Sequence, residues 1–459
     1  MREKNGRITI FITSFHGLLS RILGSGVLDE LLKNKYVNVV LFVLDIKKKY
    51  YEEKFGSDRV KIETVSLNNS PKKSKFFQKV AFFLLSTDTT KIQRCSSLKK
   101  NKEYFTFVFN SVLSFLGRFK IVRGFFRLSY FYFSTPNFFF HQFDIYRPNL
   151  VFSMDCKNLS DSQMLFEAKK RGIKTVGMVR SWDNLTAKGI LRILPDFFIV
   201  HNEITKEEVV KYADFSPQNI YVSGSPQHDF FINFKRTGRE EFFKKIGVDI
   251  GKRVILFAPT GSHYSETDWQ ILKIMKDFIA SGVIPSDIHF IVRFPPSDNV
   301  ELNSFEPDNN FSYDFINSSE LGEEKVNKKN NEMTVAESLH LADLIFHSEI
   351  VIAGPSTILI DGIAMDKPAI AIGFDGFEEK EYYLSIIRYY DYCHMSKLLS
   401  SSAVKLARNK NDLAKFINEY LNDPTLDKEY RKKAVSEQCF VVDGKSSERV
   451  AKCVLSKIE

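Results

Sequence analysis

The sequence predicts an α/β protein that is built from two doubly wound parallel sheets. Short apolar runs, of the length of buried strands, alternate with segments of helical periodicity along most of the chain, and this alternation is typical of parallel sheets covered by helices. A polar, charged segment at residues 233–252 interrupts the alternation, which then restarts. We therefore expect two domains, at residues 1–235 and 236–459, with the last helix as a candidate to pack back on the first.

The composition fits a globular protein with more than one core. A chain of 459 residues with 44% hydrophobic content has room for roughly two to four domains. Its five cysteines are scattered, so we expect neither a disulfide framework nor a zinc site, as suits a reducing cytosol. The apolar stretch near the N-terminus is too short for a signal peptide. No uncharged run reaches the roughly 18 residues of a membrane-spanning helix.

The expected elements follow from periodicity, Gly and Pro positions and helix caps. In the first domain we expect strands at 7–15, 37–44, 150–153, 174–179, 196–201 and 220–223, and helices at 19–34, 160–171 and 205–212. In the second we expect strands at 253–258, 287–293, 350–353 and 369–372, and helices at 268–281, 334–342 and 356–365, with helices after residue 372. Residues 298–331 are predicted to be rich in loops.

The turn after the strand at 350–353 is the most informative feature. Gly354-Pro355 supplies a tight reversal and leaves Ser356 and Thr357 at a helix start. In a parallel sheet such a turn lies at the carboxyl edge, where open α/β folds bind ligands and free N–H groups face an anion. Asp361 follows Thr357 by one helical turn and would accept hydrogen bonds from ribose hydroxyls. An ordinary turn with an N-cap is the alternative interpretation.

A second turn belongs to the same predicted sheet edge. Thr260, Gly261, Ser262 and His263 follow the first strand of the second domain, and their backbone is a candidate to hold a phosphate or the base. Arg293 ends another strand and would project its guanidinium at that edge towards phosphate oxygens. A plain loop and a solvated arginine are the alternatives.

Three residues at strand ends of the first domain are candidates for a general base. His16, Asp155 and Asp183 lie on loops that follow predicted strands, and transfer to a hydroxyl needs a group that takes its proton. Solvation or capping is the usual role of such residues.

Further polar residues surround Asp183 in the sequence. Arg180, Trp182 and Asn184 are candidates for contact with the acceptor, although Trp182 could belong to the core and Arg180 could cap a helix. His228 and Asp229 fall near the predicted domain crossing, where we interpret them as part of a hinge turn. No Asp-x-Asp pair occurs, so no metal is expected, and the helix dipole and Arg293 would neutralise the leaving group.

Two Rossmann-like halves with phosphate-type turns in the second resemble the GT-B fold of nucleotide-sugar-dependent glycosyltransferases, in which the two domains face across a cleft. GPSTILIDGIAMDKPAIAI, at 354–372, is similar to their donor-binding segment, with Asp361 where many have Glu. RSWDNLTAKG (180–189), DFFIVHNEITKEE (196–208) and YVSGSPQHDFF (221–231) look like bacterial surface-polysaccharide transferases. Those are related in fold to CDP-glycerol glycerophosphotransferases and non-hydrolysing UDP-GlcNAc 2-epimerases. The resemblance covers most of the chain except residues 71–140.

The resemblance implies a metal-independent glycosyltransferase of polysaccharide biosynthesis in the capsule or cell envelope. The enzyme would move a sugar from a nucleotide-activated donor to a surface polysaccharide or lipid-linked glycan, with no further cofactor. Three alternatives stay open: a polyol-phosphate transferase of the CDP-glycerol type, an enzyme like the UDP-GlcNAc 2-epimerases, and a non-catalytic scaffold that binds nucleotide or glycan. The sugar, nucleotide, acceptor, stereochemical outcome and oligomeric state are not legible in the sequence.

Residues 71–140 form a basic, aromatic insertion. They hold 13 Lys or Arg against Asp88 and Glu103, and 19 of the 63 aromatic residues of the chain. Such a segment is typical of interfacial helices that lie on anionic lipid, and predicts a cytoplasmic protein that is peripheral on the inner face of the membrane. Aromatics packed on the first domain, with solvated lysines, are the alternative. Nucleic-acid binding is not expected, because no known nucleic-acid-binding motif is present.

Overall fold

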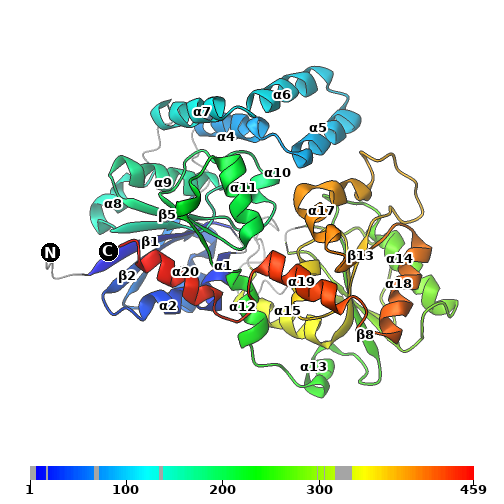
Figure 1. The fold of residues 1–459 in the computed structure, drawn as a ribbon. Helices are drawn as coiled ribbons and strands as arrows, with labels where there is room; N and C mark the ends of the chain where they lie inside the picture. Colours follow the sequence, from blue (N-terminus) through cyan, green and yellow to red (C-terminus); the bar gives the residue numbers. More distant parts are fainter. Residues whose placement is uncertain are drawn as a thin grey trace. The chain divides into compact units, whose positions relative to one another are not determined.

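The computed structural model describes residues 7–16, 19–66, 72–133, 138–296, 298–303, 305–315 and 333–458. The described chain divides into two compact units. The first comprises the residues up to Gln227 together with those from Lys445 onward, and the second comprises the described residues from His228 to Gly444. Each unit is built around one sheet (Figure 1) in which every described strand pairs in parallel, as predicted.

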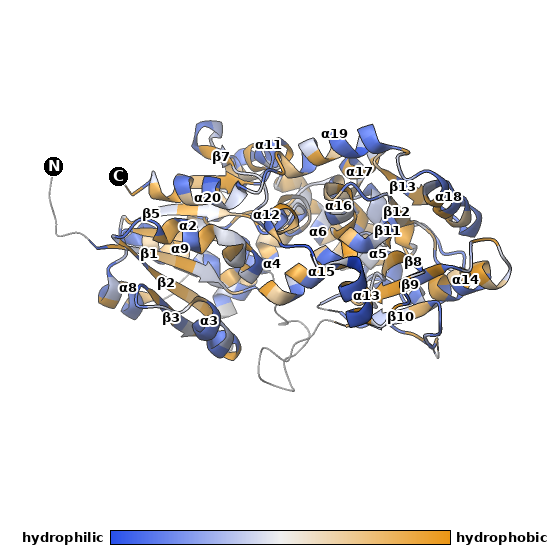
Figure 2. Cartoon of the chain, turned by 90° about the horizontal axis from the view of Figure 1, so that it is seen from below, coloured by the Kyte–Doolittle hydropathy of each residue, from blue (hydrophilic) through white to orange (hydrophobic). Residues whose placement is uncertain are grey.

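The first sheet has the order β3-β2-β1-β4-β5-β6-β7, which is that of a doubly wound sheet that grows outward from β1 in two directions. Its strands are β1 (Ile8–Ser14), β2 (Val37–Leu44), β3 (Val60–Val65), β4 (Leu150–Ser153), β5 (Lys174–Met178), β6 (Phe197–Val200) and β7 (Ile220–Val222). The strands β1 and β2 are coloured mostly as hydrophobic in Figure 2, as expected for strands that are covered on both faces.

Helices cover both faces of this sheet. They are α1 (Leu19–Ile22), α2 (Leu28–Leu32), α3 (Lys48–Phe55), α8 (Phe140–Tyr146), α9 (Leu159–Lys170), α10 (Asn184–Ala187), α11 (Glu203–Ala213) and α20 (Ser446–Leu455). Leu31 of α2 and Val450 of α20 pack with Ile10 of β1 in one core. Phe143 of α8 and Met164 of α9 belong to the core on the opposite face. The C-terminal helix α20 thus completes the first unit.

Four further helices of the first unit form what we call the helical block: α4 (Lys72–Leu84), α5 (Asp88–Asn101), α6 (Tyr104–Leu116) and α7 (Lys120–Phe133). In Figure 1 they stand apart from the sheet, beyond α9 and α11. A small core that includes Leu85, Phe126 and Ile190 joins the block to the rest of the unit. No single helix among the described residues is long and apolar enough to cross a membrane; by length and composition alone, α6 and α7 pass together as a pair bent by 103°.

The second sheet has the order β10-β9-β8-β11-β12-β13. Its strands are β8 (Arg253–Ala258), β9 (Ile288–Arg293), β10 (Phe311–Asp314), β11 (Ser348–Ala353), β12 (Ala369–Ile372) and β13 (Val404–Ala407). The helices are α12 (Pro226–Asn233), which begins in the first unit, α13 (Arg239–Ile246), α14 (Asp268–Ala280), α15 (Val335–His347), α16 (Ile358–Ala364), α17 (Cys393–Ser400), α18 (Lys410–Asn422) and α19 (Lys428–Cys439). Leu272 of α14 and Ile417 of α18 pack on the same face, against Ile255 and Ile352.

Three strands, β3, β10 and β13, were not predicted, and all three lie at a sheet edge. An edge strand is only partly buried, so its sequence need not be strongly apolar. In β10, for example, three of the four residues are only half-buried. The predicted loop-rich segment at 298–331 therefore contains a strand, and its residues 316–331 lie outside the described part of the chain.

We predict that the ion pairs at Asp214 hold the helical block to α11. Arg123 Nε donates to Asp214 at 2.8 Å and Arg127 Nη1 at 2.9 Å, and all three side chains are largely buried. Asp214→Asn keeps the shape, and Asn tolerates the positive φ at this position, but it leaves two buried cations without their anion. We expect a loss of about 3 kcal/mol in the free energy of unfolding, measured by denaturant titration.

The matched control is Glu30→Gln, which breaks an exposed pair with Lys33 and should change stability by less than about 1 kcal/mol. Equal effects of the two substitutions would refute the anchoring role.

Candidate active site

In the second unit, the predicted donor turn follows β11 at the carboxyl edge of the sheet. Gly354 is buried, Pro355 and Ser356 are half-buried and Thr357 is exposed. The helix α16 begins at Ile358, two residues later than predicted, so the two hydroxyl residues precede the helix. The Ser356 hydroxyl accepts a hydrogen bond from the Ile358 amide at 3.5 Å. The turn presents a small, polar surface to solvent.

The two predicted donor turns lie against each other. The strands β8 and β11 are neighbours, with Ala353 opposite Ala258, so the turns that follow them leave the sheet side by side. A Cβ atom on Gly354 would lie 2.1 Å from Thr260 Oγ1. Only glycine permits this approach, and the structure thus brings both predicted turns into one site.

Buried Asp268, at the start of α14, organises the turn after β8. Its carboxylate accepts hydrogen bonds from the amides of Thr260, at 3.0 Å, and Gly261, at 2.8 Å. Burial raises the pKa of Asp268 to about 6, although the two amides act in the opposite direction. The amides that we predicted to hold a phosphate are therefore engaged by the chain itself in this structure.

The next two residues of that turn are also held internally. Ser262 donates from both its amide, at 2.7 Å, and its hydroxyl, at 2.9 Å, to the carbonyl of Asn299. The amide of His263 donates to Asp298 at 2.9 Å. The turn is thus fixed in shape, and contact of these residues with a donor stays a prediction.

Arg293 does not project into solvent as we expected. It is buried and donates to Asp314, at 2.5 Å, and to Glu337, at 2.6 Å. Asp314 lies directly across from it in the register of β10 and β9, and Glu337 lies in the first turn of α15. The prediction missed this pairing because it missed β10. With its terminal nitrogens paired, Arg293 serves the fold here rather than an exposed phosphate site.

Asp361, predicted to contact ribose, is buried in the first turn of α16. Its Oδ1 atom lies 3.2 Å from Nε2 of His228, a residue of α12 that we had interpreted as part of a hinge turn. Burial lowers the pKa of His228, but Cys439 and Asp361 raise it to about 10 overall. The histidine therefore holds the carboxylate from inside the unit. The ribose contact stays a prediction.

In the first unit, Asp155 is a structural anchor. It follows β4, is buried, and accepts hydrogen bonds from Arg180 at 2.7 Å and from Asn184 at 3.3 Å. This pairing ties the loop after β5 to the loop after β4. Its carboxylate is thus occupied by residues that were predicted to contact the acceptor, which leaves it poorly placed as a general base.

His16 and Asp183 are brought into one charged cluster. Burial, together with the charges of Arg180, Lys47 and Lys188, lowers the pKa of His16 to about 3, while Asp183 acts in the opposite direction. His16 is therefore neutral at pH 7. Lys188 lies 2.8 Å from Asp183 Oδ2, and the carboxylate stays partly exposed. Trp182, next to it, is half-buried.

Asp161 is a buried acid that we did not single out in the sequence. It sits in the first turn of α9, and its Oδ1 accepts hydrogen bonds from Thr13 and, at 2.8 Å, from Ser153. Its Oδ2 has no partner among the described residues. Burial, together with Asp155, raises the pKa of Asp161 to about 8. The polar run Ser-Asp-Ser, at 160–162, on a helix that packs on a sheet was the signal that could have revealed it.

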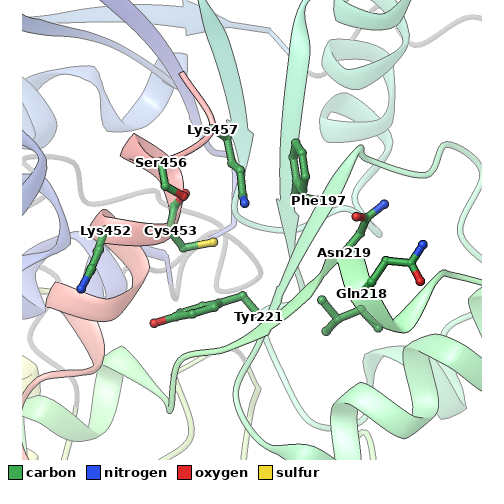
Figure 3. Close-up of a pocket in the computed structure, with 9 residues that line it drawn as sticks. Phe197, Gln218, Asn219, Tyr221, Lys452, Cys453, Ser456 and Lys457 are labelled. Carbon is green, nitrogen blue, oxygen red and sulfur yellow. The ribbon is translucent and has the colours of Figure 1, made fainter. Parts of the chain in front are cut away.

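Figure 3 shows a pocket at the opposite edge of the first sheet. This cavity of about 250 Å³ lies where β6 and β7 begin, and Phe197, Tyr221, Lys452 and Lys457 line it. Lys457 Nζ lies 4.5 Å from the centre of the Phe197 ring. No predicted site residue borders it. Among the residues that the structure describes, no cluster of His, Cys, Asp and Glu is arranged to hold a metal.

Two parallel α/β units, the second with neighbouring turns at the carboxyl edge of its sheet, define a GT-B-like fold. A family model described as CDP-glycerol:poly(glycerophosphate) glycerophosphotransferase matches residues 175–456, which is more than half of the chain. The chain belongs to this family. It is therefore a transferase of the kind that moves a sugar or glycerophosphate from a nucleotide-activated donor to a cell-surface polymer.

Solved structures share the fold at low sequence identity. UDP-GlcNAc 2-epimerase from Neisseria meningitidis, bound to UDP-GlcNAc, is 12% identical with a TM-score of 0.56, over 98% of this chain and 100% of the other. The wall teichoic acid polymerase TagF is 12% identical with a TM-score of 0.52, over 98% and 89%. The S. aureus MnaA–UDP structure is 10% identical with a TM-score of 0.52, over 96% and 94%. No curated protein sequence matches the chain. These likenesses confirm the predicted fold.

We predict that Gly354→Ala disrupts the paired turns. The new Cβ would meet Thr260 Oγ1 at 2.1 Å, so one turn must move at a cost of about 1–3 kcal/mol of stability. Thermal unfolding should show a lower midpoint and a smaller stabilisation by the donor nucleotide. Gly238→Ala is the matched control, because a Cβ there meets nothing within 4 Å. A Gly354→Ala protein as stable as this control would contradict the close approach.

We also predict that Asp161 makes stability depend on pH. Because the folded-state pKa of about 8 lies above the usual value for Asp, the native state binds the proton while the unfolded chain has already released it. The contribution of protonated Asp161 to the free energy of unfolding is therefore fully present below about pH 4. It declines as pH rises to about 8, by at most about 1.4 kcal/mol per pH unit. Asp161→Asn, measured by thermal unfolding across this range, should gain stability relative to wild type as pH rises. Parallel pH profiles for the two proteins would show that Asp161 is ionised in the native state.

Proposed function

We propose that the protein transfers a sugar from a nucleotide-activated donor to a hydroxyl group of a surface polysaccharide or a lipid-linked glycan. The observation that carries this proposal is the contact between the turns after β8 and β11, which lie within the residues matched by the transferase family model. Paired small-residue turns allow a diphosphate to approach the backbone closely. Ser356 and Thr357 offer hydroxyl groups there, so the donor would bind in the second unit.

Transfer of glycerophosphate is the second candidate, and the description of the matched family favours it. The two reactions break different bonds. A glycosyltransferase breaks the bond between the sugar carbon and the phosphate and releases a nucleoside diphosphate. A glycerophosphotransferase breaks the diphosphate linkage and releases a nucleoside monophosphate. The nucleotide product therefore distinguishes the two candidates.

Asp183 is the residue that we propose as general base. Asp155 is buried and paired with Arg180, and Arg180, Lys47 and Lys188 oppose the positive charge that His16 would gain on taking a proton. Asp183 is partly exposed and lies 2.8 Å from Lys188. A carboxylate within hydrogen-bond reach of an acceptor hydroxyl is suited to take its proton. Trp182, next to it, would offer a ring face to a sugar.

The helical block supports the proposal that the enzyme works in the cytoplasm, on the inner face of the cell membrane. Its product would then belong to the capsule or cell envelope. Large apolar side chains of α6 and α7 are exposed, and they include Phe105, Val108, Phe109, Phe115, Ile121, Phe125, Leu128 and Tyr132. Monomeric soluble proteins rarely expose so large an apolar patch. Nearby Lys and Arg residues would interact with anionic lipid. Such a position would bring the enzyme to a lipid-linked acceptor.

The test is an assay of nucleotide release from UDP-, GDP- and CDP-sugars and from CDP-glycerol, with and without EDTA. We expect a nucleoside diphosphate from one sugar donor, unchanged by EDTA because the family resemblance predicts no metal. Asp183→Asn should lower kcat by about 10²- to 10⁴-fold without loss of thermal stabilisation by the donor. Asp144→Asn, at an exposed carboxylate of the same unit, is the matched control and should keep full activity.

Other results of this assay would select the alternatives. Release of CMP from CDP-glycerol would establish the second candidate. Conversion of a UDP-sugar to its epimer without an acceptor would favour the epimerase-like enzyme. Donor binding without any turnover would favour the non-catalytic scaffold and overturn the proposal.

A further inference from the structure

A basic cavity lies within the first unit where the helical block meets α11. Its volume is about 390 Å³, and its walls come from the turn between α4 and α5, from α5, from the turn between α6 and α7, and from α11. Ser86 and Thr87 contribute hydroxyl groups, and Lys91, Arg94, Arg118 and Lys211 contribute cations. None of the residues predicted from the sequence as site residues lines this cavity.

The charge of this cavity is not balanced by its own residues. Among the described residues, Lys91, Arg94, Arg118 and Lys211 have no carboxylate at ion-pair distance. Arg118 donates to the neutral hydroxyl of Ser86 at 3.1 Å. Asp88 is the one acid in the lining, and a further arginine there is already paired with Asp214. Four cations thus face one carboxylate, which favours an anionic ligand.

Arg94 connects this basic cavity to an apolar one. It is half-buried, and burial lowers its pKa, as does the nearby Arg118. It also lines a neighbouring cavity of about 310 Å³, together with Phe82, Leu98 and Phe107. A ligand with a charged phosphate next to an apolar portion would fit both cavities. The phosphate would meet the cations of the basic cavity, and the apolar portion would meet the apolar side chains of its neighbour.

We propose that the basic cavity binds the phosphate group of a membrane-lipid headgroup. The inference rests on the proposed membrane association and adds a specific ligand site to it. The lipid source is favoured because Arg118 lies in the bend between α6 and α7, two helices that expose large apolar side chains. Guanidinium and ammonium groups form strong, charge-assisted hydrogen bonds with phosphate oxygens.

The cavity is also joined to the loop that carries Asp183. Thr87, in its wall, donates from Oγ1 to the carbonyl of Thr186 at 2.6 Å. The amide of Ile190, also in its wall, donates to the Ala81 carbonyl at 2.9 Å. A lipid phosphate bound here would therefore lie beside the proposed acceptor loop.

The test is sedimentation of the full chain with phosphatidylcholine vesicles that contain either phosphatidic acid or an equal charge of oleate, which has no phosphate. Wild type should prefer phosphatidic acid on the order of tenfold. The double variant Arg94→Gln/Arg118→Gln should lose this preference. So should Lys91→Gln/Lys211→Gln, in which both replaced side chains are exposed, so that folding should not change. The matched control, Lys75→Gln/Lys79→Gln, removes the same charge from exposed positions of α4 outside the cavity and should keep the preference.

Two outcomes would overturn the proposal. The first is a preference for phosphatidic acid that persists in both cavity variants. The second is thermal stabilisation of wild type, but not of the cavity variants, by inorganic phosphate or glycerol 3-phosphate without any vesicle preference, which would assign the cavity to a soluble phosphate. Thermal stabilisation of the same proteins by the nucleotide-activated donor is measured separately. Its absence from wild type would count against the proposed function and leave the vesicle result standing.

Discussion

In a parallel sheet each strand must be followed by a crossover that returns the chain to the edge where the strand began. The carboxyl ends of all strands therefore gather along one edge of each sheet. In the second unit this constraint places the turns after β8 and β11 next to each other, although about 95 residues separate them in the sequence. In the first unit it places the loops that carry His16, Asp155 and Asp183 at the corresponding edge. The candidate donor site in the second unit therefore depends on the adjacency of these two turns more than on any single side chain.

Buried carboxylates give these loops their shape. Asp268 holds the turn after β8 by two amides, and Asp155 holds Arg180 and Asn184. Asp161 ties the ends of β1 and β4 through Thr13 and Ser153. A buried charged or polar group is costly unless it is hydrogen-bonded, so each of these acids stabilises the particular loop conformation in which it finds its partners. Preorganised loops of this kind spare a ligand the cost of ordering them.

The strands at the centre of both sheets could be predicted because full burial imposes continuous apolar runs, as in β1, β8 and β11. The edge strands could not, because half-exposed positions do not require such runs. The two turns after β8 and β11 were located correctly from Gly354 and Gly261, since the local sequence determines a turn, whereas their contact with a donor stays a prediction. Partners far along the chain were not predictable: Arg293 meets Asp314 through a strand that the sequence does not signal, and 133 residues separate Asp361 from His228. Local chemistry is legible in a sequence, whereas long-range pairing needs the fold.

The hydrogen bonds from Thr87 to Thr186 and from Ile190 to Ala81 have a thermodynamic consequence. They join the helical block directly to the loop after β5. A ligand that orders one of them lowers the entropic cost of ordering the other. By linkage the effect is reciprocal, so an acceptor bound at the loop, as proposed, would strengthen the proposed attachment of the block to a membrane by the same factor. The enzyme would then dwell longest on those membranes that carry its own acceptor.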